Sequence, residues 1–428
     1  MSFSSFSVPK GNLMIHILHE IHPTKVTIKD FPCGSGKTTK MLQNLHIDKL
    51  YLIVVPYKSE IIRVLDATRP LGFEEPLECM TDQKTKRSAL IKLIGLKKSI
   101  VTTHSLYNEL GKLAAEGLFR EYNIIIDEVP EIIKSVTSLS KTSLTEFYIN
   151  TGYLDISEEG LCIPTAKWFL SNKAVSDTLN SRILAAAEAA NLFVSKQGTF
   201  FRAIPTQLFF ECRTLTVLTY QASGSYLIKF LEKFGISYVL EFDELEEKCF
   251  RNKAKRLITI LDSNALAGLN FTYAKQIKHF DDLATMNTIR SVLKNLRTRQ
   301  MQGVSLENLM VTCAEDNWRD AKAYKAGKLV LKGFSKGTGL GKANWVSNQT
   351  RGTNKYSHCS HLIYLYDKHP VPPFTQWLGC SGKQFSDQYA LTELIQWIWR
   401  SRIRNNEPIT LFIPSIRMKR LLLNWLNS

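Results

Sequence analysis

The sequence lacks the features that mark secreted, metal-stapled and membrane-spanning proteins. Its eight cysteines include no C-x-x-C pair, which argues against a zinc ribbon and against a disulfide framework. No uninterrupted apolar run is long enough to span a bilayer, and the amino terminus lacks the apolar core of a signal peptide. We find no internal repeat and no low-complexity tract. These absences predict a cytoplasmic protein with no membrane partner.

Acidic residues are scarce relative to basic ones. The 428 residues include 55 Lys and Arg against 39 Asp and Glu, which gives a formal net charge of +16. The basic surplus is clustered in segments 84–98 and 400–420, and clustering favours a polyanionic partner over a general gain in solubility. A chain of this length with 44% hydrophobic residues can bury two substantial cores. We therefore expect a nucleic-acid-facing protein of about two or three domains.

Short apolar strands alternate with amphipathic helices, which predicts an α/β fold with parallel sheets covered on both faces. The alternation weakens over 131–214, which we interpret as an insertion in the first domain. The predicted domains are 1–240 and 241–428. The expected strands are 25–30, 51–55, 100–103, 124–126 and 215–219 in the first domain, and 256–261, 309–313, 361–366 and 409–413 in the second.

A glycine-rich segment, residues 31–39 with the sequence FPCGSGKTT, lies between a predicted strand and a predicted helix. Gly34 and Gly36 let the backbone curve around phosphate oxygens, and the helix that opens at Thr38 adds the positive end of its dipole. Lys37 is placed to reach the β- and γ-phosphates of a nucleoside triphosphate, and the Thr38 hydroxyl to ligate Mg²⁺. The predicted phosphate-binding residues are Gly34, Ser35, Gly36, Lys37, Thr38 and Thr39.

A second apolar strand delivers two acidic residues at its carboxyl end. The run 124–126 consists of three isoleucines, which is typical of a strand buried on both faces, and Asp127 and Glu128 follow directly. Taken alone, the pair fits an ordinary solvated turn. Together with the glycine-rich loop, it predicts that Asp127 holds Mg²⁺ and that Glu128 orients and deprotonates the attacking water.

With these motifs in place, the chain resembles the superfamily 2 helicases of the DExx-box type, and among them the small helicase-like proteins of bacteriophages. The similarity rests on ordered motifs in both halves rather than on continuous identity. The matching segments are 31–38 for motif I, 55–59 for motif Ia, 101–106 for the next motif that grips a nucleic-acid backbone, 127–130 for the DExx box, 218–223 for motif III, 347–354 for motif V and 396–404 for motif VI.

The resemblance implies two RecA-like P-loop NTPase domains in tandem, which hydrolyse ATP with Mg²⁺ in the cleft between them to move along or unwind nucleic acid. It implies DNA in preference to RNA, a role in phage DNA replication or recombination in the host cytoplasm, and partners such as a single-strand binding protein. In motif V it assigns Gly352 to the nucleotide. The nucleic-acid contacts that it assigns are Pro56, Lys58, Thr102, Thr103, His104, Ser105 and Arg351.

Motif VI also has a physical reason to face a phosphate. On a helix that we predict over 389–404, Gln396, Arg400 and Arg404 are spaced by four residues and share one face. A guanidinium that crosses the cleft when the domains close would stabilise charge on the transferring phosphate. We therefore predict Gln396, Arg400 and Arg404 as catalytic residues, together with Glu128 and Lys37.

Two other classes of function share some of these features. A viral DNA-packaging, terminase-like ATPase also has a P-loop and an acidic strand end, but it needs a nuclease domain with several inward carboxylates. The carboxyl half carries Arg351-Gly352 and the segment 396–404 instead. A nucleic-acid-binding protein with a relic nucleotide pocket is the other alternative, and the intact Lys37 and Glu128 count against it.

Overall fold

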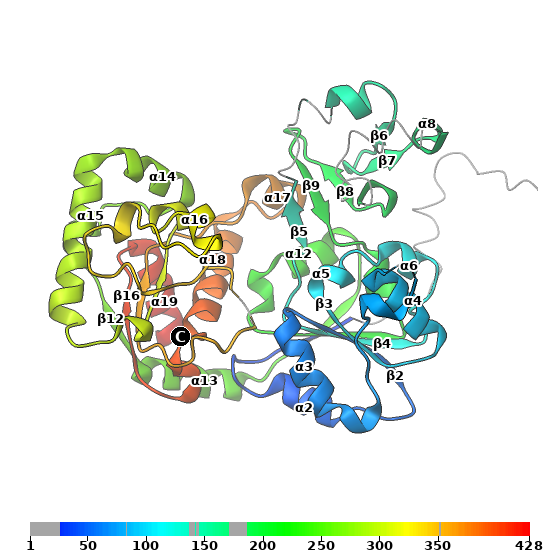
Figure 1. Ribbon diagram of the computed structural model, residues 1–428, viewed down its shortest axis with the longest axis horizontal. Helices are drawn as coiled ribbons and strands as arrows, with labels where there is room; N and C mark the ends of the chain where they lie inside the picture. The colour runs from blue at the N-terminus through cyan, green and yellow to red at the C-terminus, as the bar shows by residue number, and fades with distance from the viewer. Residues whose placement is uncertain (1–25, 83, 137–141, 143–144, 171–185, 351) are drawn as a thin grey trace, which may run out of the picture.

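The chain folds into two lobes, each built around a parallel β-sheet (Figure 1). This computed structural model describes residues 26–82, 84–136, 142, 145–170, 186–350 and 352–428. Both sheets carry helices on their two faces, so the predicted α/β class with two domains in tandem is confirmed. Within the described ranges, no helix is both long and apolar enough to cross a membrane.

The first sheet has six parallel strands in the order β11-β1-β10-β4-β2-β3. Its strands are β1 (Val26–Asp30), β2 (Leu50–Val55), β3 (Ile100–Thr103), β4 (Tyr122–Asp127), β10 (Thr214–Thr219) and β11 (Tyr238–Glu241). Side chains alternate between two cores, since Ile124 and Ile126 pack on one face and Ile125 packs on the other. Because all six strands are parallel, their carboxyl ends meet at one edge of the sheet.

Two helices cover one face of the first sheet, and a larger group covers the other. The first pair is α2 (Lys37–Gln43) and α3 (Lys58–Ala67). The larger group is α4 (Lys86–Gly95), α5 (His104–Tyr107), α6 (Gly111–Ala115), α11 (Gln207–Phe210) and α12 (Tyr226–Lys233). Helices α2, α3 and α5 start at the carboxyl-end edge of the sheet, directly after β1, β2 and β3, so the loops that precede them lie at the same edge.

The predicted insertion lies between β4 and β10. It contains a three-stranded antiparallel sheet in the order β5-β9-β8 and a separate hairpin of β6 and β7. The elements are β5 (Ile133–Ser135), β6 (Leu154–Ile156), β7 (Cys162–Pro164), α8 (Ala166–Leu170), β8 (Leu192–Val194) and β9 (Phe200–Ala203). The insertion has its own small apolar cluster around Trp168 and Leu192.

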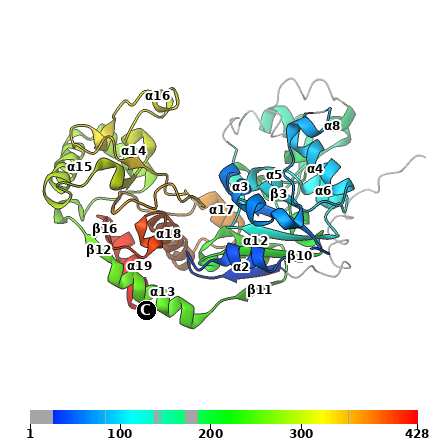
Figure 2. The same cartoon turned by 60° about the horizontal axis from the view of Figure 1, so that its bottom comes forward.

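The second sheet has five parallel strands in the order β12-β16-β15-β13-β14. Its strands are β12 (Ile258–Leu261), β13 (Leu309–Thr312), β14 (Asn344–Trp345), β15 (His361–Tyr364) and β16 (Ile409–Phe412). The helices are α13 (Glu244–Leu257), α14 (Tyr273–Asp281), α15 (Leu283–Asn295), α16 (Ala321–Lys325), α17 (Pro372–Trp377), α18 (Lys383–Ile398) and α19 (Ile416–Asn427). Figure 2 shows α13 leading from β11 of the first lobe into the second lobe.

The helix predicted over 389–404 is shorter at its carboxyl end than expected. Helix α18 ends at Ile398, and Arg402–Asn405 form a separate 3-10 turn. The Ser401 hydroxyl donates to the Ile398 carbonyl, and the Arg402 N–H donates to the Cys359 carbonyl just before β15. These bonds turn the chain out of the helix and toward the start of β16.

Part of the second lobe packs into the apolar core of the first lobe. Helix α17 belongs to the second lobe in sequence, but Phe374 and Leu378 pack in the core of the first lobe. The Trp377 ring lies 5.0 Å from the Phe201 ring of β9, measured between centroids, and its indole N–H donates to the Glu159 carbonyl of the insertion. In Figure 1, α17 lies between the second lobe and the insertion strands. We name this contact the α17 clasp.

Candidate nucleotide site

The loop from Phe31 to Gly36 connects β1 to α2 and takes a conformation that requires glycine at two positions. Gly34 and Gly36 have φ angles of 81° and 76°, which side-chain-bearing residues rarely adopt. A Cβ built on either glycine would have no other atom within 4 Å, so this side of the backbone is open to a ligand. Lys37 opens α2, and its ammonium group donates to the Phe31 carbonyl at 2.8 Å.

The two residues predicted to hold Mg²⁺ are in direct contact. Thr38 on α2 donates its hydroxyl hydrogen to Asp127 Oδ1 at the end of β4, over 2.8 Å. Burial and the neighbouring charge of Glu128 raise the pKa of Asp127 from 3.8 to about 6, whereas the Thr38 hydrogen bond and Arg63 act to lower it. A carboxyl group in this setting gains from a nearby cation, because the cation stabilises its charged form.

Glu128 has an unusual backbone conformation. Its φ angle is 64°, in the left-handed region, where a residue with a side chain costs about 1–3 kcal/mol. The Glu128 N–H donates to the Leu218 carbonyl of β10 at 2.8 Å, and His104 Nε2 lies 2.9 Å from the carbonyl oxygen of Asp127. The Glu128 side chain reaches toward the second lobe, where its Oε1 lies 3.8 Å from Arg400 Nη2.

A cavity of about 300 Å³ lies between the lobes. All of Gly34 to Thr39 line it, together with Asp127 and Glu128, and the second lobe contributes Gly352, Arg400 and Arg404. Arg404 Nη1 donates to the Thr353 carbonyl at 3.3 Å. Burial and the adjacent Arg400 charge lower the pKa of Arg404. Residues predicted from both halves of the sequence therefore meet around one space.

Gln396 lies outside this cavity, contrary to the predicted shared face. Because α18 ends at Ile398, Arg400 and Arg404 no longer follow the helical spacing that would align them with Gln396. Gln396 is buried, and its Nε2 donates to the Tyr220 carbonyl of the first lobe at 3.3 Å. Gln396 thus joins the lobes rather than facing the nucleotide cavity.

The residues predicted to contact nucleic acid have different environments. Lys58 and Ser105 are exposed at the carboxyl-end edge of the first sheet. Pro56 packs against the second lobe, because a Cβ on Gly352 would lie 2.4 Å from Pro56 Cγ. Arg351 lies outside the described residues.

The predictions for residues 102–105, at the end of β3 and the start of α5, need correction in one case. Thr102 is only 2% exposed within the sheet, so its side chain has no surface to offer a nucleic acid. Thr103 caps the amino end of α5 by accepting a hydrogen bond from the Leu106 N–H. His104 points to the Asp127 carbonyl at the candidate active site.

Several residues that line the cavity were not among the predicted site residues. Arg63 on α3 lies 3.6 Å from Asp127 Oδ2 through Nη2, and Nε donates to Glu60 at 2.7 Å. The other such residues are Cys33, Asn354 and Trp399. The one signal in the sequence for Arg63 and Glu60 is their spacing of three on the helix that follows β2, which places both charges on one face near the strand ends.

The comparisons with known proteins are consistent with this architecture. A family model described as the YonV C-terminal Rossmann-like domain matches residues 252–426. The chain is similar to the SPbeta prophage-derived uncharacterized protein YonV of Bacillus subtilis (strain 168). The two are 26% identical over an alignment of 430 positions, which covers 94% of this chain and 99% of the relative.

Among solved structures, the chain is similar to one named XPD_APO, with a TM-score of 0.50 and 13% identity over 94% of this chain and 95% of that chain. It is also similar to S. tokodaii Xpd4, with a TM-score of 0.47 and 12% identity over 94% of each chain. The likeness to XPD_APO is one of fold, and with the two parallel sheets it confirms two RecA-like domains in tandem with an insertion in the first.

Proposed function

We propose that the chain is an ATP-dependent nucleic-acid helicase or translocase that hydrolyses ATP between its two lobes. The observation that carries the proposal is the single cavity to which the first lobe contributes Lys37, Thr38, Asp127 and Glu128 and the second lobe contributes Arg400. Because neither lobe alone supplies the full set, the rate of hydrolysis depends on how the lobes lie together. An enzyme with this dependence can convert hydrolysis into movement of one lobe against the other.

The residues present fit ATP and Mg²⁺. The Thr38 hydroxyl and the Asp127 carboxylate are hard oxygen ligands 2.8 Å apart, which suits Mg²⁺, and the open backbone at Gly34 suits a phosphate. Mg²⁺, when bound there, neutralises negative charge on the phosphate oxygens. Lys37 binds the β- and γ-phosphates, Glu128 accepts a proton from the attacking water, and the second-lobe arginines stabilise the charge of the transferring phosphate.

The nucleic acid in this proposal lies along the carboxyl-end edge of the first sheet, where Lys58 and Ser105 are exposed. The net charge of +16 supports a polyanionic partner. We propose DNA as the substrate, phage DNA replication or recombination in the host cytoplasm as the setting, and a single-strand binding protein as a partner. The prophage origin in the name of the YonV relative supports this setting.

The test is an ATPase assay of the purified chain with single-stranded DNA, duplex DNA and RNA side by side. We expect hydrolysis that increases with at least one nucleic acid and that is lost in Lys37→Ala, because this lysine serves the phosphates. The Lys37→Ala variant should keep its nucleic-acid binding at low salt, since the proposed nucleic-acid contacts at Lys58 and Ser105 do not include Lys37. Hydrolysis by Lys37→Ala at the parent rate would contradict the assignment of the site.

The same assay separates the alternatives. A relic pocket predicts nucleic-acid binding without hydrolysis under any condition. A packaging ATPase predicts nuclease activity as well, which requires a cluster of metal-binding carboxylates. Over the described ranges, no group of three or more His, Cys, Asp or Glu side chains is arranged to hold a metal ion.

A further inference from the structure

The peptide group between Asp127 and Glu128 is held from two sides. On one side, its carbonyl oxygen lies 2.9 Å from His104 Nε2, and because a carbonyl only accepts, the imidazole must donate from Nε2. On the other side, its N–H donates to the Leu218 carbonyl at 2.8 Å. The two holding residues come from the ends of β3 and β10, strands that are not neighbours in the sheet.

This peptide group sets the direction of the Glu128 side chain. Glu128 has a φ angle of 64°, a conformation that a glutamate keeps only when its surroundings impose it. A relaxed φ at this position would swing the carboxylate away from Arg400, which now lies 3.8 Å from it. The hydrogen bond from His104 is therefore well placed to preserve the geometry on which water activation depends.

His104 also connects the candidate active site with the predicted nucleic-acid face. Strand β2 lies between β3 and β4, so the imidazole must reach past the end of β2, across about 10 Å of sheet. The end of β2 leads directly into Pro56 and Lys58, and His104 is followed by the exposed Ser105. A strand of nucleic acid bound against Lys58 and Ser105 would press on the segment that carries His104.

We infer that His104 is a positioning residue that holds the Asp127–Glu128 peptide and links nucleic-acid binding at the ends of β2 and β3 to the carboxylate that activates water. The inference rests on the proposed function, and it adds how hydrolysis responds to the nucleic acid. His104 touches neither water nor nucleotide in this role, because it acts through the backbone of Asp127.

The experiment compares His104→Ala and His104→Gln with the parent chain. Glutamine can donate from its own Nε2 at a similar reach, whereas alanine cannot donate. His46→Ala is the matched control, because His46 is an exposed histidine of the same lobe. Three quantities are measured: kcat and KM for ATP with and without single-stranded DNA, the Kd of a fluorescent ATP analogue, and hydrogen exchange of the peptide that spans residues 122–130.

For His104→Ala we expect kcat to fall by about 10²-fold, as small displacements of a reacting group cause. The Kd of the ATP analogue should change less than about twofold, because the Lys37 loop does not depend on His104. The ratio of DNA-stimulated to basal kcat should fall toward one. Amide exchange over residues 122–130 should become faster, because the strand end opens more often once the Asp127 carbonyl no longer accepts a hydrogen bond from His104. His104→Gln should restore most of kcat, of the stimulation ratio and of the exchange protection, and His46→Ala should match the parent in all three.

Results that differ from these would overturn specific parts of the inference. Parent-like exchange and parent-like kcat in His104→Ala would overturn the inference, and so would a failure of His104→Gln to restore either. A fall in kcat with an unchanged stimulation ratio would overturn the link to nucleic acid. If the parent chain hydrolyses no ATP, the proposed function fails, and the exchange data alone then decide whether His104 holds the peptide.

Discussion

At the scale of single residues, the guanidinium groups of Arg400 and Arg404 differ in their surroundings. Arg400 is 5% exposed and lies 3.8 Å from the Glu128 carboxylate. Arg404 lines the same cavity but donates to the Thr353 carbonyl of its own lobe. Arg400 is therefore the better placed of the two to reach a phosphate that Glu128 faces.

We predict that Arg400→Ala lowers ATP turnover by about 10³-fold, the lower end of the range for an arginine finger, while ATP still binds. Arg404→Ala should lower ATP turnover by about tenfold or less, because the Arg404 guanidinium already donates a hydrogen bond to the Thr353 carbonyl. Arg402→Ala is the matched control, since Arg402 donates to the Pro408 carbonyl and lies outside the cavity. Steady-state kinetics and nucleotide binding check this, and equal losses for Arg400→Ala and Arg402→Ala would contradict it.

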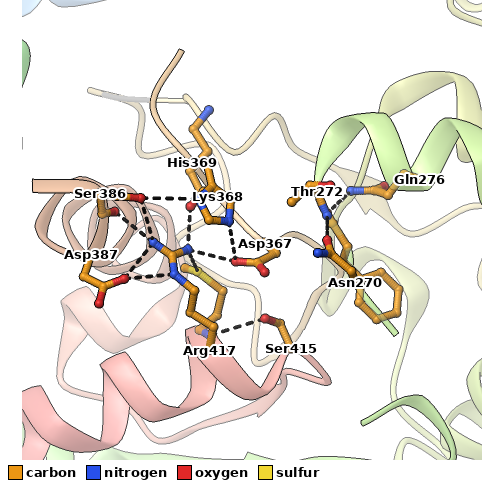
Figure 3. A network of polar contacts seen from close by, with 12 residues as sticks. Asn270, Thr272, Gln276, Asp367, Lys368, His369, Ser386, Asp387, Ser415 and Arg417 are labelled. Carbon is orange, nitrogen blue, oxygen red and sulfur yellow. Dashed lines mark hydrogen bonds and ion pairs between the residues drawn. The ribbon is translucent and has the colours of Figure 1, made fainter. Parts of the chain in front are cut away.

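Arg417 joins three segments of the second lobe through one guanidinium group (Figure 3). It donates to Asp387 Oδ1 on α18 and to Asp367 Oδ1 after β15, both at 2.9 Å, and to the Ser386 carbonyl. Burial acts to raise the pKa of Asp367, but hydrogen bonds from His369 and Arg417 outweigh it and hold the pKa below the usual 3.8. The ionised Asp367 thus stabilises the folded chain.

We predict that this stabilisation is complete above about pH 4 and is lost as the pH falls below it. The sign follows because the folded state binds the proton less readily than the unfolded state does. Below pH 4, the free energy of unfolding, followed by circular dichroism, should therefore fall less with decreasing pH in Asp367→Asn than in the parent. An Asp367→Asn variant with the same pH dependence as the parent would show that the network adds nothing at acid pH.

At the scale of elements, the 3-10 turn Ala222–Gly224 after β10 joins the first lobe to α18. The Ala222 N–H donates to Asp30 Oδ2 at the end of β1, at 2.9 Å. A Cβ on Gly224 would lie 2.1 Å from Thr392 Oγ1 and 2.6 Å from the Gln388 carbonyl, both on α18. The turn therefore links β1, the strand before the glycine-rich loop, with α18, the helix before Arg400.

We predict that Gly224→Ala pushes α18 away from the first lobe and lowers ATP turnover by about 10²-fold through misplacement of Arg400. The free energy of unfolding should fall by about 1–3 kcal/mol, which is typical of overpacking. Gly95→Ala is the control, because a Cβ there would have no other atom within 4 Å. Turnover and urea unfolding of both variants test this, and a Gly224→Ala variant with parent turnover would contradict it.

At the scale of the whole molecule, the α17 clasp packs a helix of the second lobe into the core of the first lobe. Phe374 is 4% exposed, and its ring centroid lies 5.5 Å from that of Phe201 and 6.0 Å from that of Tyr226. The Val371 N–H also donates to the Tyr226 hydroxyl. Helix α18 continues from the clasp, since Phe385 belongs to the first-lobe core and Leu394 to the second.

We predict that Phe374→Ala lowers the free energy of unfolding by about 3–5 kcal/mol and splits urea unfolding into two transitions, one for each lobe. Phe280→Ala should leave both unchanged, because Phe280 is 46% exposed on α14. Small-angle X-ray scattering should also show a larger radius of gyration for Phe374→Ala. A single transition at the parent midpoint would show that the clasp does not join the lobes energetically.

The sequence alone was sufficient for the features that arise within short segments. The positive φ angles at Gly34 and Gly36 are local demands, so a tight glycine-rich turn between a strand and a helix could be predicted from nine consecutive residues. Apolar β-branched runs such as 124–126 predicted the central strands and placed Asp127 at a strand end. The alternation of such strands with helices predicted the α/β class, its weakening over 131–214 indicated the insertion, and the resemblance of the ordered motifs implied two RecA-like domains.

Tertiary structure alone decided the features that depend on residues far apart in sequence. Arg63 reaches Asp127, and His104 holds the same strand end, only because the parallel sheet brings the ends of β2, β3 and β4 together. Helical spacing predicted one face for Gln396 and Arg400, but packing ended α18 between them. Likewise, the packing of β3 within the first sheet buries Thr102. Burial and orientation are properties of the packed neighbours, which a local pattern does not contain.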